Sequence, residues 1–183
     1  MKEAEITKKP IAIICDIDNC YTDSREWIAT APINSGDKST DRKAWDEYQT
    51  RDYLCKPNNP FIEYIVRLSQ VTPILFVTSR EDRKNSKADT IRHIEEFSDG
   101  KIKLGDRHKL FMRREFDYRP SNEVKKDILI TEIIPNYVPI LAYDDELRNI
   151  KMYAEMGIVC ALYDLTTNSS KCMTKKDFEE TVA

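Results

Sequence analysis

Five short apolar runs, rich in β-branched residues, recur along the chain and constrain its fold more than any other feature. Each run has the length of one strand and is almost continuously apolar, which is typical of strands buried on both faces of a parallel sheet. The runs cover residues 11–15, 73–77, 109–112, 138–142 and 158–163. They predict the strands of one buried sheet.

Helical spacing of apolar residues fills most of the intervals and predicts helices over residues 59–68, 88–97, 121–131 and 147–153. Asn59-Pro60 indicates an N-cap followed by proline at the first helical position, and Ser121 can cap the third helix. Gly100 and Gly157 are placed to end the second and fourth helices. The alternation predicts an α/β fold, a three-layer α/β/α doubly wound parallel sheet.

The length of 183 residues, 40% of them hydrophobic, suits one compact domain, so we expect residues 1–183 to form a single domain. Residues 22–57 break the alternation: they are polar, and we expect one helix around residues 41–53. A small insertion of this kind after the first strand is typical of a lid. Its aromatic side chains can either stack on nucleobases or pack the lid onto the core. They are Trp27, Trp45, Tyr48 and Tyr53.

Charge and cysteine usage exclude several classes of protein. A net charge of -3 argues against coating of nucleic acid or membrane by bulk charge, although a local basic surface remains open. The five cysteines contain no CxxC pair, and the two histidines lie in separate segments, so a zinc site or a Ser-His-Asp triad is not expected. Without an apolar leader or a membrane-length apolar run, the sequence predicts a soluble, cytoplasmic protein that does not bind membranes.

Chemically reactive side chains follow the predicted strands. In open α/β sheets ligands bind beyond the carboxyl ends of the strands, so these residues are expected to converge on one site. They are Asp16, Asp18, Thr78, Ser79, Arg80, Asp144 and Asp145, with Lys125 on the helix before the fourth strand. Four carboxylates this close repel one another unless a cation neutralises them, and an oxygen-rich set suits Mg²⁺. The sequence thus predicts a magnesium cofactor.

A phosphate dianion would find its charge compensated by Mg²⁺ and by Lys125, and Asp16 could attack phosphorus in line to give an aspartyl-phosphate. Asp18, two residues later where the chain leaves the strand, could protonate the leaving oxygen and later deprotonate the hydrolytic water. The residues therefore predict a phosphomonoester hydrolase. Cys20 lacks the Cys-x5-Arg loop of cysteine phosphatases, so a small buried residue is expected there.

These motifs resemble the haloacid dehalogenase-like (HAD) superfamily, with DxDx[T/V], a Ser/Thr, a Lys and an acidic pair in that order across residues 11–145. The resemblance implies Asp16 as nucleophile and metal ligand, and Asp18 as acid/base whose backbone carbonyl binds the metal. It implies Asp145 as the further metal ligand with Asp144 supporting it. Thr78 and Lys125 would hold phosphoryl oxygens.

The segments LFMRREFDYRPSNEVKKDIL and PILAYDDE resemble more closely the phosphatase domain of phage-type polynucleotide kinase/phosphatase, over residues 10–164. That resemblance implies removal of 3′-phosphates from nucleic-acid ends, with Arg80 and Arg119 binding substrate beside Ser79. Two places differ from the family pattern: Asn19-Cys20-Tyr21 replaces Gly-Thr-Leu, and Ser121 replaces an acidic residue. No GxxxxGK[S/T] phosphate loop of a kinase occurs.

Three functions remain open at this stage: a polynucleotide 3′-phosphatase, a phosphatase of nucleotides or small metabolites, and a phosphate- or nucleic-acid-binding module without turnover. Residues 101–119 carry seven Lys/Arg against three Asp/Glu, which fits either a track for a phosphate backbone or a solvated charged surface. His93 lies on an apolar helix face and is expected to be structural.

Overall fold

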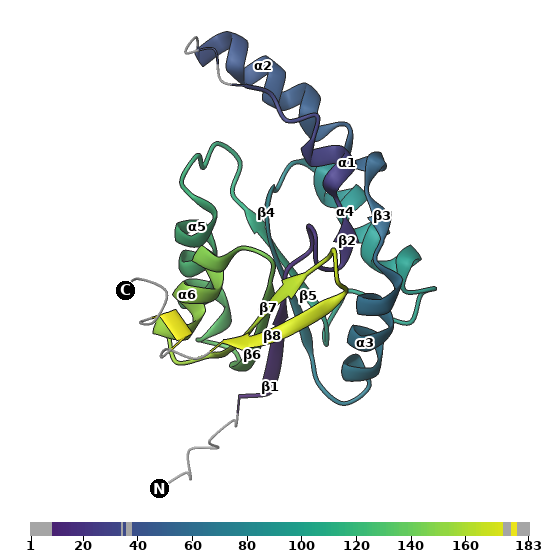
Figure 1. Ribbon diagram of the computed structural model, residues 1–183, viewed down its shortest axis with the longest axis vertical. Coiled ribbons are helices and arrows are strands. Elements are labelled where there is room, and N and C mark those ends of the chain that lie inside the picture. The colour runs from purple at the N-terminus through teal and green to yellow at the C-terminus, as the bar shows by residue number, and fades with distance from the viewer. Residues whose placement is uncertain (1–8, 34, 36–37, 174–176, 179–183) are drawn as a thin grey trace, which may run out of the picture.

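The computed structural model describes residues 9–33, 35, 38–173 and 177–178, and a six-stranded sheet forms its centre (Figure 1). The strand order is β5-β4-β1-β6-β7-β8; the first five strands run parallel, and β8 is antiparallel to β7. The strands are β1 (Ile11–Cys15), β4 (Ile74–Glu81), β5 (Lys109–Arg113), β6 (Val138–Asp144), β7 (Val159–Asp164) and β8 (Ser169–Met173). The five predicted strands are confirmed.

The sixth strand, β8, was not predicted. Its sequence SSKCM is polar, and only Met173 is buried, so it lacks the apolar run that marks the inner strands. Lying at the edge of the sheet beside β7, it needs to bury only one end. The second predicted strand is also longer than expected, because β4 continues four residues past Val77 to Glu81.

Four helices cover the two faces of the sheet. They are α3 (Asn59–Ser69) and α4 (Lys84–Phe97) on one face, and α5 (Ser121–Ile128) and α6 (Leu147–Glu155) on the other (Figure 1). The π-helical turn η2 (Leu129–Ile133) extends α5. All four predicted helices are present within these bounds, so the expected three-layer α/β/α arrangement is confirmed.

Side chains of β1 show why the apolar runs are continuous. Ala12 and Ile14 belong to the hydrophobic core under α5 and α6, whereas Ile13 and Cys15 belong to the core under α3 and α4. Successive side chains of a strand point to opposite faces, so a strand covered on both faces needs apolar residues at every position. This double burial fixes β1 at the centre of the sheet, directly before Asp16.

The two predicted helix caps are wrong. Asn59 is the first residue of α3, and the N-cap is Asn58, whose side-chain amide donates to the carbonyl of Cys20 at 2.6 Å. Ser121 is likewise the first residue of α5, after Pro120 at the N-cap. In both places the polar side chain bonds to another part of the fold instead of capping its own helix.

The described residues between 22 and 57 form a small layer beyond the sheet, with helix α2 projecting away from it (Figure 1). Trp27 stacks on Tyr48 with ring centroids 4.7 Å apart, and Trp45 packs against Tyr48, so these rings form the insertion's own core. Tyr53, by contrast, is 67% exposed. The elements are β2 (Thr22–Asp23), α1 (Arg25–Ile28), α2 (Lys38–Gln49), the 3₁₀ helix η1 (Asp52–Leu54) and β3 (Lys56–Pro57).

The helix expected around residues 41–53 therefore begins and ends earlier, at Lys38 and Gln49. None of the described helices is long and apolar enough to cross a membrane.

Candidate active site

Asp16 follows β1 directly, and its backbone N–H donates to the carbonyl of Tyr143 in β6 at 3.0 Å. The turn after it closes when the N–H of Thr22 donates to the carbonyl of Ile17 at 2.8 Å. Asn19 in this turn has φ 57°, in the left-handed region that asparagine tolerates better than most side chains. Asn19 thus allows this turn to adopt a positive φ without a glycine.

Lys125 joins the ends of two strands. Its Nζ lies 2.6 Å from Oδ1 of Asp16 and 2.7 Å from Oδ2 of Asp144, and all three side chains are buried. Burial raises the pKa of Asp16 well above its ordinary value, against the opposing charge of Lys125. Burial disfavours the charged form of Lys125, but the two carboxylates raise its pKa overall. The site is a buried cation between two carboxylates, built on the central strands.

Asp144 is held from its other side by Asn149 of α6. The Asn149 amide donates to Oδ1 of Asp144 at 2.9 Å and to Oγ of Ser121 at 3.0 Å. Ser79 Oγ in turn donates to Ser121 Oγ at 2.8 Å. Asn149 is completely buried and so connects the carboxylate partner of Lys125 with the hydroxyl at the end of β4. Sequence reasoning missed it, since an asparagine inside a helix carries no motif.

Asp18 lies in a separate ion pair. Nη2 of Arg80 donates to Oδ1 of Asp18 at 2.6 Å, Nε donates to Oδ2 at 3.0 Å, and Ser24 Oγ donates to Oδ1 at 2.6 Å. Burial alone would raise the pKa of Asp18, but the charge and hydrogen bonds of Arg80 lower it, with help from Ser24. The guanidinium of Arg80 also lies 4.8 Å from the ring centroid of Trp27, which ties the insertion to the site.

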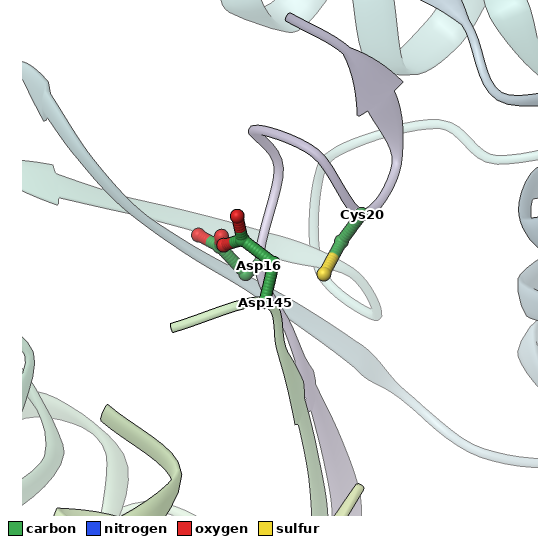
Figure 2. Close-up of side chains that lie close together, drawn as sticks. All are labelled: Asp16, Cys20 and Asp145. Carbon is green, nitrogen blue, oxygen red and sulfur yellow. The ribbon is translucent and has the colours of Figure 1, made fainter. Parts of the chain in front are cut away.

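A candidate cation site lies beside Asp16. Atoms of Asp16, Cys20 and Asp145 lie within 4.8 Å of one another (Figure 2). Burial and Asp144 raise the pKa of Asp145 to about 6, and Oδ1 of Asn19 is buried without a hydrogen-bond partner. Two carboxylates and an unpartnered amide oxygen are the donors that Mg²⁺ prefers. The residues fit that ion, whereas burial raises the pKa of the Cys20 thiol and disfavours the ligating thiolate.

A cleft of about 580 Å³ opens at this point, and Asp16, Asp18 and Lys125 line it together with Ser79 and Arg80. The structure therefore brings together most of the residues predicted from the strand ends. The volume of the cleft is in the range of sites that bind a small ligand or a few groups of a larger ligand.

Thr78 and Arg119 differ from the other predicted residues. Thr78 is completely buried, its Oγ1 accepts a hydrogen bond from the N–H of Arg80 at 3.1 Å, and it does not line the cleft. Arg119 lines the cleft but is half exposed, and it pairs with Asp117 at 2.7 Å and Asp127 at 2.6 Å. A phosphate contact by either residue therefore stays a prediction.

The basic segment 101–119 does not form one surface. Lys109 begins β5 and Arg113 ends it, so the segment spans the length of the sheet. Arg107 and Lys109 line a depression at the other end of the strands with Pro10 and Pro73, whereas Arg113 and Arg119 line the cleft. Only the later part of the segment can meet a substrate at the site.

Comparisons with known proteins concern the family and the fold. The model of the polynucleotide kinase PNKP phosphatase domain matches residues 10–164. A chain in the "Structure of the Pnkp1/Rnl/Hen1 RNA repair complex" has a TM-score of 0.58 at 19% identity, over 87% of this chain and 44% of that chain. This chain therefore spans less than half of that protein. No curated protein matches.

A haloacid dehalogenase-like hydrolase, SP0104 from Streptococcus pneumoniae, has a TM-score of 0.58 at 15% identity and is covered over 97% of its length. These likenesses below a quarter identity concern the fold, which is the three-layer sheet described above. The match to the family model is different in kind, because it covers most of the chain and both strand ends that carry the carboxylates. The chain thus belongs to the PNKP phosphatase-domain family of the HAD superfamily and is a phosphatase.

Proposed function

We propose that this phosphatase is Mg²⁺-dependent, forms an aspartyl-phosphate on Asp16, and removes 3′-phosphates from polynucleotide ends. The observation that carries the proposal is the buried Lys125 between Asp16 and Asp144, at the cleft of a chain in this family. A fixed ammonium beside a carboxylate lowers the repulsion between that carboxylate and an incoming phosphate dianion. Asp16 and Asp145 are the residues that would hold Mg²⁺, which supplies further positive charge against the phosphoryl oxygens.

In the first step a carboxylate oxygen of Asp16 bonds to phosphorus, the bond from phosphorus to the sugar oxygen breaks, and that oxygen takes a proton from Asp18. In the second step water bonds to phosphorus, Asp18 takes its proton, and the bond between Asp16 and phosphorus breaks to release phosphate. Arg80 favours the carboxylate form of Asp18, the form that the second step uses. The first step requires Asp18 to be protonated and the contact with Arg80 to loosen.

The substrate part of the proposal is supported by the family match and by Arg113 and Arg119 along the cleft. The Pnkp1 protein with the same fold occurs in an RNA repair complex. A second candidate, a phosphatase of free nucleotides, is favoured by the insertion, because Trp45 and Gln49 of α2 also line the cleft and restrict it. The two candidates differ in whether the substrate extends out of the cleft.

One phosphate-release assay separates these possibilities. Oligonucleotides with a 3′-phosphate or a 5′-phosphate and free mononucleotides are compared with and without Mg²⁺. We expect the 3′-phosphate to react fastest and chelation to abolish release. Faster turnover of mononucleotides would exclude the 3′-end proposal, and no release from any substrate would favour a binding module.

The nucleophile is tested by Asp16→Asn, which keeps the size of the side chain and removes its charge. We expect release of phosphate to fall below detection, since the amide cannot attack phosphorus. Asp106→Asn is the matched control, because Asp106 is exposed and lines the depression at the other end of the strands. Unchanged hydrolysis of a generic aryl phosphate by Asp16→Asn would show that Asp16 is not the nucleophile.

A further inference from the structure

Two large aromatic side chains are exposed on the loop between β5 and α5, beside the cleft. Phe116 is 63% exposed and Tyr118 is 69% exposed. The Arg42 guanidinium, on α2, lies 4.4 Å from the ring centroid of Phe116 and donates a hydrogen bond to the Tyr118 hydroxyl. The aromatic rings of the insertion are different: Trp27 and Tyr48 are buried against each other. Phe116 and Tyr118 therefore expose ring surface beside the cleft, which the stacked pair Trp27 and Tyr48 does not.

The backbone of this loop is strained and held in place. Phe116 has φ 66°, in the left-handed region where a bulky side chain is an outlier. The Arg113 guanidinium braces the loop from inside by donating to the carbonyls of Asp117 at 2.8 Å and Arg119 at 2.6 Å. Strain of this kind persists where the surrounding structure imposes it, and it concentrates at ligand-binding positions. The loop keeps an exposed ring in an unfavourable conformation, which points to a contact outside the protein.

The position of the loop connects it with the reaction. Tyr118 lines the same cleft as Asp16 and Lys125, and Phe116 lies farther out with Arg114 and Tyr118 along a shallow depression. A polynucleotide that extends from Asp16 along this route passes Tyr118 and then Phe116, with arginine side chains beside both rings. Aromatic rings next to cations are the combination that binds single-stranded nucleic acid, with bases stacked on the rings and phosphates near the cations.

We propose that Tyr118 and Phe116 form a base-stacking clamp for the nucleotides next to the terminal phosphate of a single-stranded end. This proposal rests on the proposed function and adds how that substrate is held. Tyr118 stacks on the base nearest the phosphate and Phe116 stacks on the next one through the ring face that Arg42 does not cover, while Arg42 also holds the Tyr118 hydroxyl. Bases inside a duplex are stacked on both sides and a terminal base pair has only one open face, so a clamp on two successive bases selects unpaired ends.

The test compares Tyr118→Ala with wild type on two oligonucleotide 3′-phosphates that differ only in whether the terminal nucleotide carries a base. For wild type, the ratio of kcat/KM for the intact substrate over the abasic one should exceed unity. Loss of stacking should lower that ratio about fivefold to 150-fold in Tyr118→Ala, and Tyr118→Phe should restore it. The matched control is Tyr53→Ala, because Tyr53 is 67% exposed and does not line the cleft; it should leave the ratio unchanged.

Equal losses on both substrates would mean that Tyr118 supports only the loop, and an unchanged ratio would mean that no base stacks on it; either result overturns the clamp. A binding assay with a fluorescent single-stranded oligonucleotide and the Asp16→Asn protein keeps the two proposals separate. If wild type releases no 3′-phosphate but Tyr118→Ala weakens this binding, the proposed function fails and the clamp stands. If 3′-phosphate is released and binding is insensitive to both Tyr118→Ala and Phe116→Ala, the clamp fails alone.

Discussion

Two regions hold their charges in the same pattern but in different surroundings: the buried centre around Lys125, and the contact between α2 and the loop before α5 around Arg42, called the cleft mouth below. In the centre, Lys125 lies between Asp16 and Asp144, and the three side chains are 2%, 6% and 1% exposed. At the mouth, Arg42 lies between Asp46 at 2.9 Å and Glu115 at 3.6 Å, and these side chains are 23%, 45% and 44% exposed. All four contacts are within ion-pair distance, so the presence of a contact alone does not tell which pair matters.

Exposure to solvent determines how much each of these ion pairs matters. Breaking a buried ion pair leaves a desolvated charge without a partner, whereas an exposed partner regains water and is screened by salt. The centre is also fixed by the strands β1 and β6, while the mouth is built from α2 and a loop. We therefore expect variants in the centre to affect stability and catalysis together, and variants at the mouth to affect mainly which substrate is used.

The largest effect is expected for Lys125→Met. Without the lysine ammonium group, Asp16 and Asp144 face each other in a buried site, which should lower the free energy of unfolding by about 3–5 kcal/mol. Phosphate release should fall by at least about 10²–10³-fold, since the fixed cation is lost. Urea unfolding and a release assay measure the two effects. The control is Lys126→Met on the exposed side of α5; similar results for both variants would contradict the importance of the buried pair.

The next effect is expected for Asp18→Asn, and it depends on the leaving group. A sugar oxygen is a poor leaving group and needs a proton, so release from a 3′-phosphate should fall by about 10²–10⁴-fold. An aryl phosphate with an acidic phenol leaves without that proton, and its first step should fall much less, which single-turnover kinetics measure. Equal losses on both substrates would show that Asp18 acts through Arg80 and the insertion instead of as an acid.

A smaller effect is expected for Asn149→Leu, which is similar in size but cannot hydrogen-bond. Asp144 and Ser121 then lose their common donor, so Asp144 is no longer held in place on the side away from Lys125. We expect about 10–100-fold weaker apparent Mg²⁺ affinity or activity, as for other hydrogen-bonding groups just outside the ligands of a metal site. A Mg²⁺ titration of activity and of thermal stability measures it. Asn149→Asp can still accept a hydrogen bond from Ser121 but adds a negative charge. Comparing it with Asn149→Leu separates the effect of the lost hydrogen bonds from the effect of the added charge.

Asn149 also shows where sequence reasoning ends. The strands and the residues that follow them could be predicted, because double burial gives continuous apolar runs and parallel strands bring their ends together. The bonds of Asn149 to Asp144 and Ser121 join α5, α6 and β6, and no local pattern records such a contact. The same holds for the pair of Arg80 with Asp18, which spans 62 residues; Arg80 lies where the pairing of β4 with β5 shifts register, between Thr78 and Glu81.

The smallest effect is expected at the cleft mouth, for Asp46→Ala. Asp46 pairs with both Arg42 and Arg83, but it is 45% exposed, so both arginines regain water when it is removed. The free energy of unfolding should fall by less than about 1 kcal/mol, and the difference should shrink further in 1 M salt because exposed pairs are screened. Urea unfolding at low and high salt checks this. If the free energy of unfolding falls as much as for Lys125→Met and the loss is unaffected by salt, the mouth is as rigid as the centre. The expected difference between the two regions would then be wrong.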